Sequence, residues 1–177
     1  DGCDILEQPL EAKRKIGYLP EQPPVYTDLT VNEYLDFAAD LKGIAKKNRK
    51  KHLDEIKDLV KIADVSGRLI GNLSKGYRQR VGMAQALVGN PEILILDEPM
   101  NGLDPIGIYE MREYLVNLCK EGNTTVFISS HILSEIEQIA DVIGVMNHGR
   151  LLEEESITDL HKRLRRYAEY EVSNVEY

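Results

Sequence analysis

The sequence predicts an α/β fold in which a mostly parallel sheet carries an inserted helical segment. Short apolar or β-branched runs alternate with amphipathic stretches, which is the pattern of βαβ units. The unbroken apolar run 93–96 ends in two carboxylates and a proline, as expected of a central strand buried on both faces. Three amphipathic stretches occur in succession before this strand, and they indicate the helical insertion.

The chain begins with a short predicted strand and a well-signalled helix. Residues 15–19 form the strand, which Pro20 ends. Thr30 and Glu33 have the spacing of a capping box, so a helix opens there and Gly43 ends it. The expected apolar stripe of this helix is Val31, Leu35, Ala38 and Leu41.

Two further helices are expected before the central strand. The basic cluster 46–51 indicates a solvated loop or the start of the second helix, with phosphate or lipid contact as a minor alternative. Ser74 caps the third helix, which ends near Gly89. The expected apolar faces are Leu53, Ile56 and Val60 in the second helix, and Tyr77, Val81, Ala84 and Val88 in the third.

After the central strand the alternation resumes. Asp104 and Pro105 supply an N-cap and a first-turn proline for a helix. Further strands are expected over 124–129 and 142–146, the latter turning into a hairpin with 150–152. The helical stripes are Ile108, Met111, Leu115 and Leu118, then Ile132, Ile136 and Ile139, and finally Ile157, Leu160 and Leu164.

Composition excludes several classes of protein. The length of 177 residues suits one domain or a large piece of one. A net charge of −8 without a basic, aromatic-bearing face argues against nucleic acid as the main partner. Cys3 and Cys119 are too few for a disulfide framework and match no metal spacing, so a reducing compartment is expected. No apolar stretch approaches the roughly 20 residues that span a bilayer, and we expect a soluble chain.

Five short motifs carry the functional signal. The two acids that end the central strand lie where an α/β sheet opens its ligand crevice, and there one can hold hydrated magnesium while the other orients a water beside a phosphate. The helix amino terminus at Ser74 is an anion site, and Gly76 lets a phosphate approach the backbone. In chain order the motifs are Glu21-Gln22, Leu73 to Tyr77, Asp97-Glu98, Asn101 to Asp104, and Ser129-Ser130-His131.

This order of motifs resembles the nucleotide-binding domain of ATP-binding cassette (ABC) transporters over essentially the whole chain. The resemblance implies a P-loop NTPase (RecA-like) fold with ATP and Mg²⁺ as cofactors. It implies one partial domain, 1–177, with an approximate helical subdomain over 22–90 and catalytic core over 1–21 and 91–177. A second nucleotide-binding domain, as homodimer or heterodimer, and a transmembrane permease would be its partners. The location implied is cytoplasmic, on the inner face of the membrane through the permease.

The resemblance also implies roles for single residues. Asp97 would hold magnesium, Glu98 would polarise the attacking water, and His131 would reach the γ-phosphate. The signature segment, which contains Ser74, Lys75, Gly76 and Tyr77, would contact ATP bound by the opposite subunit. Asp104 would cross the dimer interface, and it also serves as the N-cap described above. An ordinary N-cap explains Ser74 alone but not the whole segment.

The chain departs from the commonest family pattern at three positions. Lys75 stands where glycine is usual and Tyr77 where glutamine is usual, a version similar to a prokaryotic exporter-type branch. The side-chain contacts of these two residues therefore stay open. Glu21 occupies the place of the glutamine that senses magnesium, and a carboxylate can also ligate that metal. Gln22 is adjacent and takes this place if the loop shifts by one residue.

The phosphate-binding loop Gly-x-x-x-x-Gly-Lys-Ser/Thr does not occur in these 177 residues. Residues 2–5 resemble the family's segment after that loop, so we expect an N-terminally truncated domain whose loop lies roughly 20–30 residues upstream. Such a piece should bind ATP weakly and hydrolyse essentially none. A strand that the family places within the sheet would be missing too, which should expose apolar edges.

The leading interpretation is the ATPase subunit of a bacterial exporter with a separate membrane protein. A soluble ABC ATPase that acts on ribosomes or DNA is the first alternative. Translation members tend to carry Asn-His-Leu-Asp where this chain has Asn101-Gly102-Leu103-Asp104, and the sequence shows no sustained heptads like those of the long coiled coils in DNA-repair members. A degenerate, non-hydrolytic module is the second, and intact Asp97, Glu98 and His131 argue against it. The transported substrate stays open, because membrane subunits select it.

Overall fold

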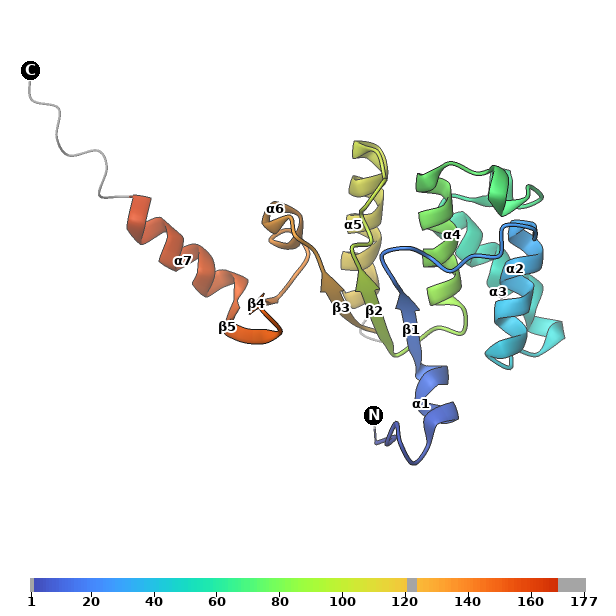
Figure 1. The fold of residues 1–177 in the computed structure, drawn as a ribbon, viewed down its shortest axis with the longest axis horizontal. Coiled ribbons are helices and arrows are strands. Elements are labelled where there is room, and N and C mark those ends of the chain that lie inside the picture. Colours follow the sequence, from blue (N-terminus) through green and yellow to red (C-terminus); the bar gives the residue numbers. More distant parts are fainter. Residues whose placement is uncertain (1, 121–123, 169–177) are drawn as a thin grey trace, which may run out of the picture. The chain divides into compact units, whose positions relative to one another are not determined.

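The computed structural model describes residues 2–120 and 124–168, with side chains up to residue 163 (Figure 1). Contacts divide the chain into two compact units, Asp1–His131 and Ile132–Tyr177, and each is described by itself. All five predicted motifs lie in the first unit. In the described ranges, none of the helices combines the length and hydrophobicity needed to traverse a bilayer.

The first unit contains a three-stranded parallel sheet in the order β1-β2-β3 (Figure 1). Its strands are β1 (Ile16–Leu19), β2 (Ile93–Asp97) and β3 (Thr125–Ser129), which confirms the predicted central strand. Leu94 and Leu96 are fully buried on one face of β2, whereas Ile93 and Ile95 on the other face are only half-buried. The prediction of a strand buried on both faces therefore holds fully only for the face of Leu94 and Leu96, against which a helix is closely packed.

That helix is α4 (Lys75–Leu87), and glycines allow its close approach to the sheet. A Cβ at Gly17 in β1 would lie 2.1 Å from the carbonyl oxygen of Ala86. A Cβ at Gly82 would lie 2.6 Å from the Cβ of Pro23. Since real Cβ atoms do not tolerate such distances, helix and sheet can pack this closely only where side chains are missing.

The helical insertion lies between β1 and β2, as the sequence predicts. It consists of α2 (Val31–Leu41), α3 (Lys46–Leu59) and α4, with 3₁₀ turns η1 (Ala63–Val65) and η2 (Ile70–Asn72) before α4. Figure 1 shows the three helices side by side. The capping box is present, because Glu33 N donates to Thr30 Oγ1 at 3.3 Å and Thr30 N donates to Glu33 Oε2 at 2.8 Å.

Two details of the insertion differ from the sequence prediction. Leu41 is 70% exposed instead of joining the apolar stripe, because it is the last residue of α2 and the chain turns away at Gly43. The basic cluster does start α3, but one member is not solvated. Arg49 is buried, and its guanidinium bonds Asp36 at 3.1 Å and Asp40 at 2.5 Å.

Helix α1 (Pro9–Lys15) was not predicted from the sequence, because it has seven residues and buries only Ala12. Its carboxyl end is capped from outside. Lys42 Nζ donates to the carbonyl oxygens of Lys13 at 2.9 Å and Ile16 at 2.6 Å. Burial lowers the pKa of this ammonium group. Tertiary contact, and not propensity, therefore stabilises α1.

Helix α5 (Pro105–Lys120) follows β2 and starts as the sequence predicts. Asp104 Oδ1 accepts from Gly107 N at 2.9 Å, so the aspartate is an N-cap. Met111 and Leu115 are buried, whereas Ile108 and Leu118 are half-buried at the margin of the stripe.

The second unit contains an antiparallel pair, β4 (Val142–Asn147) and β5 (Arg150–Ser156), which confirms the predicted hairpin. Helix α6 (Leu133–Ile136) is a single turn, shorter than the predicted stripe through 139, and α7 (Ile157–Ala168) follows β5. Leu164 lies outside the residues with described side chains. Large apolar side chains are exposed on both strands of this unit: Val142, Val145, Met146, Leu151 and Leu152. Tyr18 and Phe127 are exposed on strands of the first unit. The expectation that an absent strand exposes apolar edges stays a prediction.

Candidate functional site

The two acids at the end of β2 are held by the neighbouring strand. Asp97 and Ser129 are partners in the parallel register, and Ser129 Oγ donates to Asp97 Oδ1 at 2.5 Å. Glu98 N donates to the carbonyl oxygen of Ser129 at 3.1 Å. The end of β3 therefore fixes the direction in which both carboxylates leave the sheet.

Glu98 has a left-handed backbone conformation, with φ of +48°. This region is uncommon for residues other than glycine, and such strain is concentrated at functional sites. The conformation turns the chain sharply after the strand, and the carbonyl oxygen of Glu98 accepts from Asn101 N at 3.0 Å. The Glu98 side chain remains partly accessible, at 21% exposure.

His131 contacts this carboxylate. Its Nδ1 lies 2.9 Å from Glu98 Oε1. A carboxylate oxygen accepts from a ring N–H, so this contact fits the histidine tautomer that carries its proton on Nδ1. The pair joins the ends of two neighbouring strands, and the histidine side chain is 73% exposed. The structure thus brings together Asp97, Glu98 and His131.

The signature segment forms the amino terminus of α4. Ser74 Oγ accepts from Tyr77 N at 3.3 Å, which confirms the predicted cap. Gly76 lies against the 101–104 turn, since a Cβ there would be 3.0 Å from the carbonyl oxygen of Gly102. The Tyr77 hydroxyl donates to Asp64 Oδ2 at 3.1 Å, and this bond raises the tyrosine pKa. The ring of Tyr77 is therefore directed to η1.

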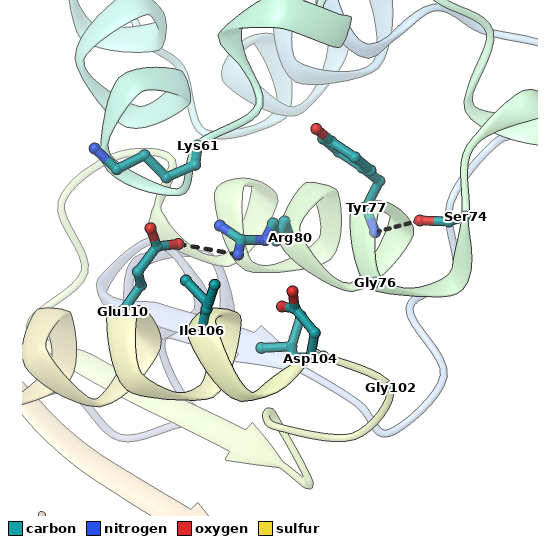
Figure 2. Close-up of a pocket in the computed structure, with 10 residues that line it drawn as sticks. Lys61, Ser74, Gly76, Tyr77, Arg80, Gly102, Asp104, Ile106 and Glu110 are labelled. Atoms are coloured by element: carbon teal, nitrogen blue, oxygen red, sulfur yellow. Dashed lines mark hydrogen bonds and ion pairs between the residues drawn. The ribbon is translucent and has the colours of Figure 1, made fainter.

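A pocket of about 390 Å³ separates the start of α4 from the start of α5 (Figure 2). Within it Arg80 pairs with Glu110 at 3.0 Å and also donates to the Val60 carbonyl oxygen at 3.1 Å. Charges of both signs line the walls. The lining residues are Lys61, Ser74, Gly76, Tyr77, Arg80, Gly102, Leu103, Asp104, Ile106 and Glu110.

Glu21 and Lys75 are connected through one amide. Lys75 Nζ donates to Asn101 Oδ1 at 3.0 Å, and Asn101 Nδ2 donates to Glu21 Oε1 at 3.3 Å. Among the described residues Gln22 makes no such side-chain bond to these loops. In this arrangement Glu21, and not Gln22, lies beside the turn that follows Asp97 and Glu98.

Comparison with known families identifies the family of the chain and its fold. The family model described as "ABC transporter" matches residues 2–101, which is more than half of the chain. The chain belongs to the ABC transporter family. The fold prediction is also confirmed, because a solved structure titled "Structure of ATP binding subunit of ABC transporter" superposes with a TM-score of 0.82. That match has 26% identity and covers 93% of this chain and 68% of the other.

Two curated relatives of this ABC family chain share almost half of its residues. The bacitracin transport ATP-binding protein BcrA of Bacillus licheniformis is 47% identical over 98% of this chain and 56% of its own length. The protein of the same name from Enterococcus faecalis is 49% identical over 90% of this chain and 51% of its own. The chain thus spans about half the length of these relatives.

Magnesium fits the residues present. Mg²⁺ is usually held by one or two carboxylates and completes its shell with water and substrate phosphates. Asp97 is such a carboxylate, oriented by Ser129, and Glu21 is a second acid in the same unit. In residues 2–120 and 124–168 no group of three or more His, Cys, Asp or Glu side chains forms a cage, and Mg²⁺ does not require one.

Sequence reasoning missed a residue that connects the signature helix to the acids. Gln79 is 2% exposed, and its Nε2 donates to the carbonyl oxygens of Glu98 at 3.5 Å and Pro99 at 3.4 Å. Gln79 lies two residues before Val81 on the same helix, between Arg78 and Arg80, so the sequence carries little local signal for its burial; once buried, its amide needs a partner. Asn101 and Ser129 lie inside predicted motifs, but no role was assigned to them.

Proposed function

We propose that the chain is the nucleotide-binding part of an ABC exporter subunit, which binds and hydrolyses ATP. Closure of two such domains head to tail would drive export through a separate membrane subunit. The Glu98–His131 pair beside Asp97, at the carboxyl edge of β2 and β3, is the observation that carries the proposal. The family match and the two relatives support it.

The residues of this edge have distinct proposed tasks. Asp97 would hold Mg²⁺, directly or through water, with its free lone pairs, while Ser129 occupies one of its oxygens. The ion, when bound, would neutralise charge on the phosphates. Glu98 would orient the attacking water as acceptor of its proton. His131, whose Nδ1 contacts Glu98, would reach the γ-phosphate with the rest of its ring.

The signature segment would serve the nucleotide of the opposite subunit. Ser74 and Gly76 stand at the amino terminus of α4, a 13-residue helix whose free N–H groups favour an anion. Lys75 and Tyr77 would contribute to the same face, and Asp104 lies across the pocket from Tyr77 (Figure 2). Glu21, with Gln22 as its neighbour, would sense Mg²⁺ in the chain's own site.

The proposed partners follow from this assignment. They are a transmembrane permease and a second nucleotide-binding domain, identical or different, with the chain on the cytoplasmic face of the membrane. Nucleic acid is not among the proposed partners, since the net charge is −8. The names of the relatives support a bacitracin-like compound as cargo.

The test is Glu98→Gln in the protein expressed from its complete coding sequence. ATP binding should persist, turnover should fall by about 10²-fold or more, and closed dimers should accumulate in light scattering with ATP. Glu92→Gln is the matched control, because Glu92 lies at the opposite end of β2 and pairs only with Lys15 at 3.3 Å in the described structure. Turnover of Glu98→Gln within a few-fold of the control would refute the role of Glu98.

A second assay concerns residues 1–177 alone. They contain no Gly-x-x-x-x-Gly-Lys-Ser/Thr loop. Backbone N–H groups and the lysine of that loop cradle the phosphates in P-loop enzymes. We therefore propose that these residues by themselves bind ATP weakly and hydrolyse essentially none, so measurable turnover by this polypeptide would contradict the proposal.

A further inference from the structure

We propose that Lys75 is a positioning residue that holds the Glu21 carboxylate through the side-chain amide of Asn101. We call these three side chains the relay. Lys75 lies at the start of α4, Asn101 in the turn after β2, and Glu21 in the loop after β1. The inference deepens the proposed function, and it rests on that function only for what Glu21 does with nucleotide.

The chemistry of the two ends determines how the central amide is oriented. The Lys75 ammonium can only donate hydrogen bonds, whereas the Glu21 carboxylate can only accept them. Asn101 must therefore turn Oδ1 to Lys75, at 3.0 Å, and Nδ2 to Glu21, at 3.3 Å. The ammonium group, the amide dipole and the carboxylate are thus aligned, and each of the two hydrogen bonds polarises the amide in the sense that strengthens the other.

The backbone around the relay is shaped to receive the lysine stem. Gly102 has φ of +82°, and a Cβ there would lie 2.9 Å from both Cδ and Cε of Lys75. The stem therefore occupies the place of a side chain at position 102. Gly76 allows the helix start to approach the Gly102 carbonyl oxygen. A glycine at position 75 would supply neither the stem nor the donor.

The relay is suited to orientation more than to stability. Its contacts join residues 26 and 80 positions apart, and they are exposed to solvent. Exposed charge contacts contribute little to the free energy of unfolding. Their effect is instead to select one rotamer of Glu21, so that its second oxygen keeps a constant direction. Without the donor at position 75, Asn101 can rotate and Glu21 loses its fixed partner.

Side-chain amide NMR without nucleotide tests the relay directly, on protein from the complete coding sequence labelled with ¹⁵N-asparagine. Asn101→Asp removes one pair of amide signals and so assigns them. Lys75→Met should shift this pair, and Lys75→Arg, which keeps a donor, should restore it. Lys47→Met is the control, because Lys47 lies exposed in α3. If Lys75→Met leaves the chemical shifts of the two Asn101 side-chain amide signals unchanged, the proposal is overturned.

A charge exchange provides the second, independent measurement. Lys75→Glu alone leaves acceptors at both ends of the amide and should displace the Asn101 amide signals from their wild-type positions. Adding Glu21→Lys should bring a single ordered pair back, because the amide can flip and serve both ends again. Purely additive effects of the two substitutions overturn the relay. Neither readout requires ATP, so the relay can fail while the Glu98→Gln test of the proposed function succeeds, and the reverse.

Discussion

Replacing Gln79 by methionine tests how the signature helix is joined to the acids of β2. Methionine has a similar volume and helix propensity, so packing in α4 is largely kept. The carbonyl oxygens of Glu98 and Pro99 lose their amide donor, and Gln79 is only 2% exposed, so water cannot readily replace it. The substitution therefore isolates the two hydrogen bonds.

The expected loss follows from these contacts. Leaving buried acceptors without a partner costs about 1–3 kcal/mol, and the long distances of 3.4 and 3.5 Å favour the lower half of that range. For a protein of this size the melting temperature should fall by roughly 2–8 °C. Because the Glu98 carbonyl belongs to the left-handed turn, ATP turnover should fall more than ATP affinity does.

Gln85→Met is the matched control for this experiment. It makes the same chemical change in the same helix, at a half-buried position for which the described residues show no side-chain hydrogen bond. Calorimetry on both variants and steady-state turnover with ATP titration provide the comparison. If melting temperature and turnover change equally in the two variants, the Gln79 hydrogen bonds do not stabilise the turn after β2.

Three further predictions concern the packing, capping and electrostatics of the first unit. Gly17→Ala should lower the free energy of unfolding by about 1–3 kcal/mol in urea titrations, because its Cβ would meet the Ala86 carbonyl oxygen at 2.1 Å; an unchanged midpoint would contradict the packing. Thr30→Ala should cost about 1 kcal/mol and Thr30→Ser much less, since both hydroxyls can cap α2. Hydrogen bonding to Arg49 lowers the pKa of Asp40, so Asp40→Asn should destabilise the fold at pH 7. Because the folded pKa is the lowered one, this stabilisation is fully present above the usual value of 3.8 and is lost as pH falls from there through the folded pKa. The difference in melting temperature between the two proteins should therefore shrink over this acid range, and a constant difference would exclude the ion pair.

Local signals in the sequence were sufficient for much of the fold. The Thr30 capping box, the Ser74 cap and the Asp104 N-cap all appear where their spacing predicts them. The apolar run before Asp97 is the central strand. Each of these signals acts within one turn or one strand, so the chain carries it without reference to any other segment. The order of motifs along the chain likewise indicates the ABC family by itself, and the family match confirms it.

Contacts between distant segments were decided only by the tertiary structure. Arg49 stands in a basic run that reads as solvated, yet α2 supplies two acids and buries it. Leu41 continues an apolar stripe, yet nothing described covers it at the end of its helix. Helix α1 depends on Lys42, 27 residues beyond its last residue. Periodicity tells which side of an element is apolar, but not which element will meet it.

The functional edge shows the same division. Residue types and spacing singled out Asp97, Glu98 and His131, because strand ends in a parallel sheet share one edge. The partners that orient them, among them Ser129 and Gln79, follow from strand register and helix packing. Strand register and helix packing depend on the angles and distances between elements. The packing of the whole unit determines those angles and distances. The sequence alone predicted which groups would do the chemistry, and the tertiary structure decided how they are held.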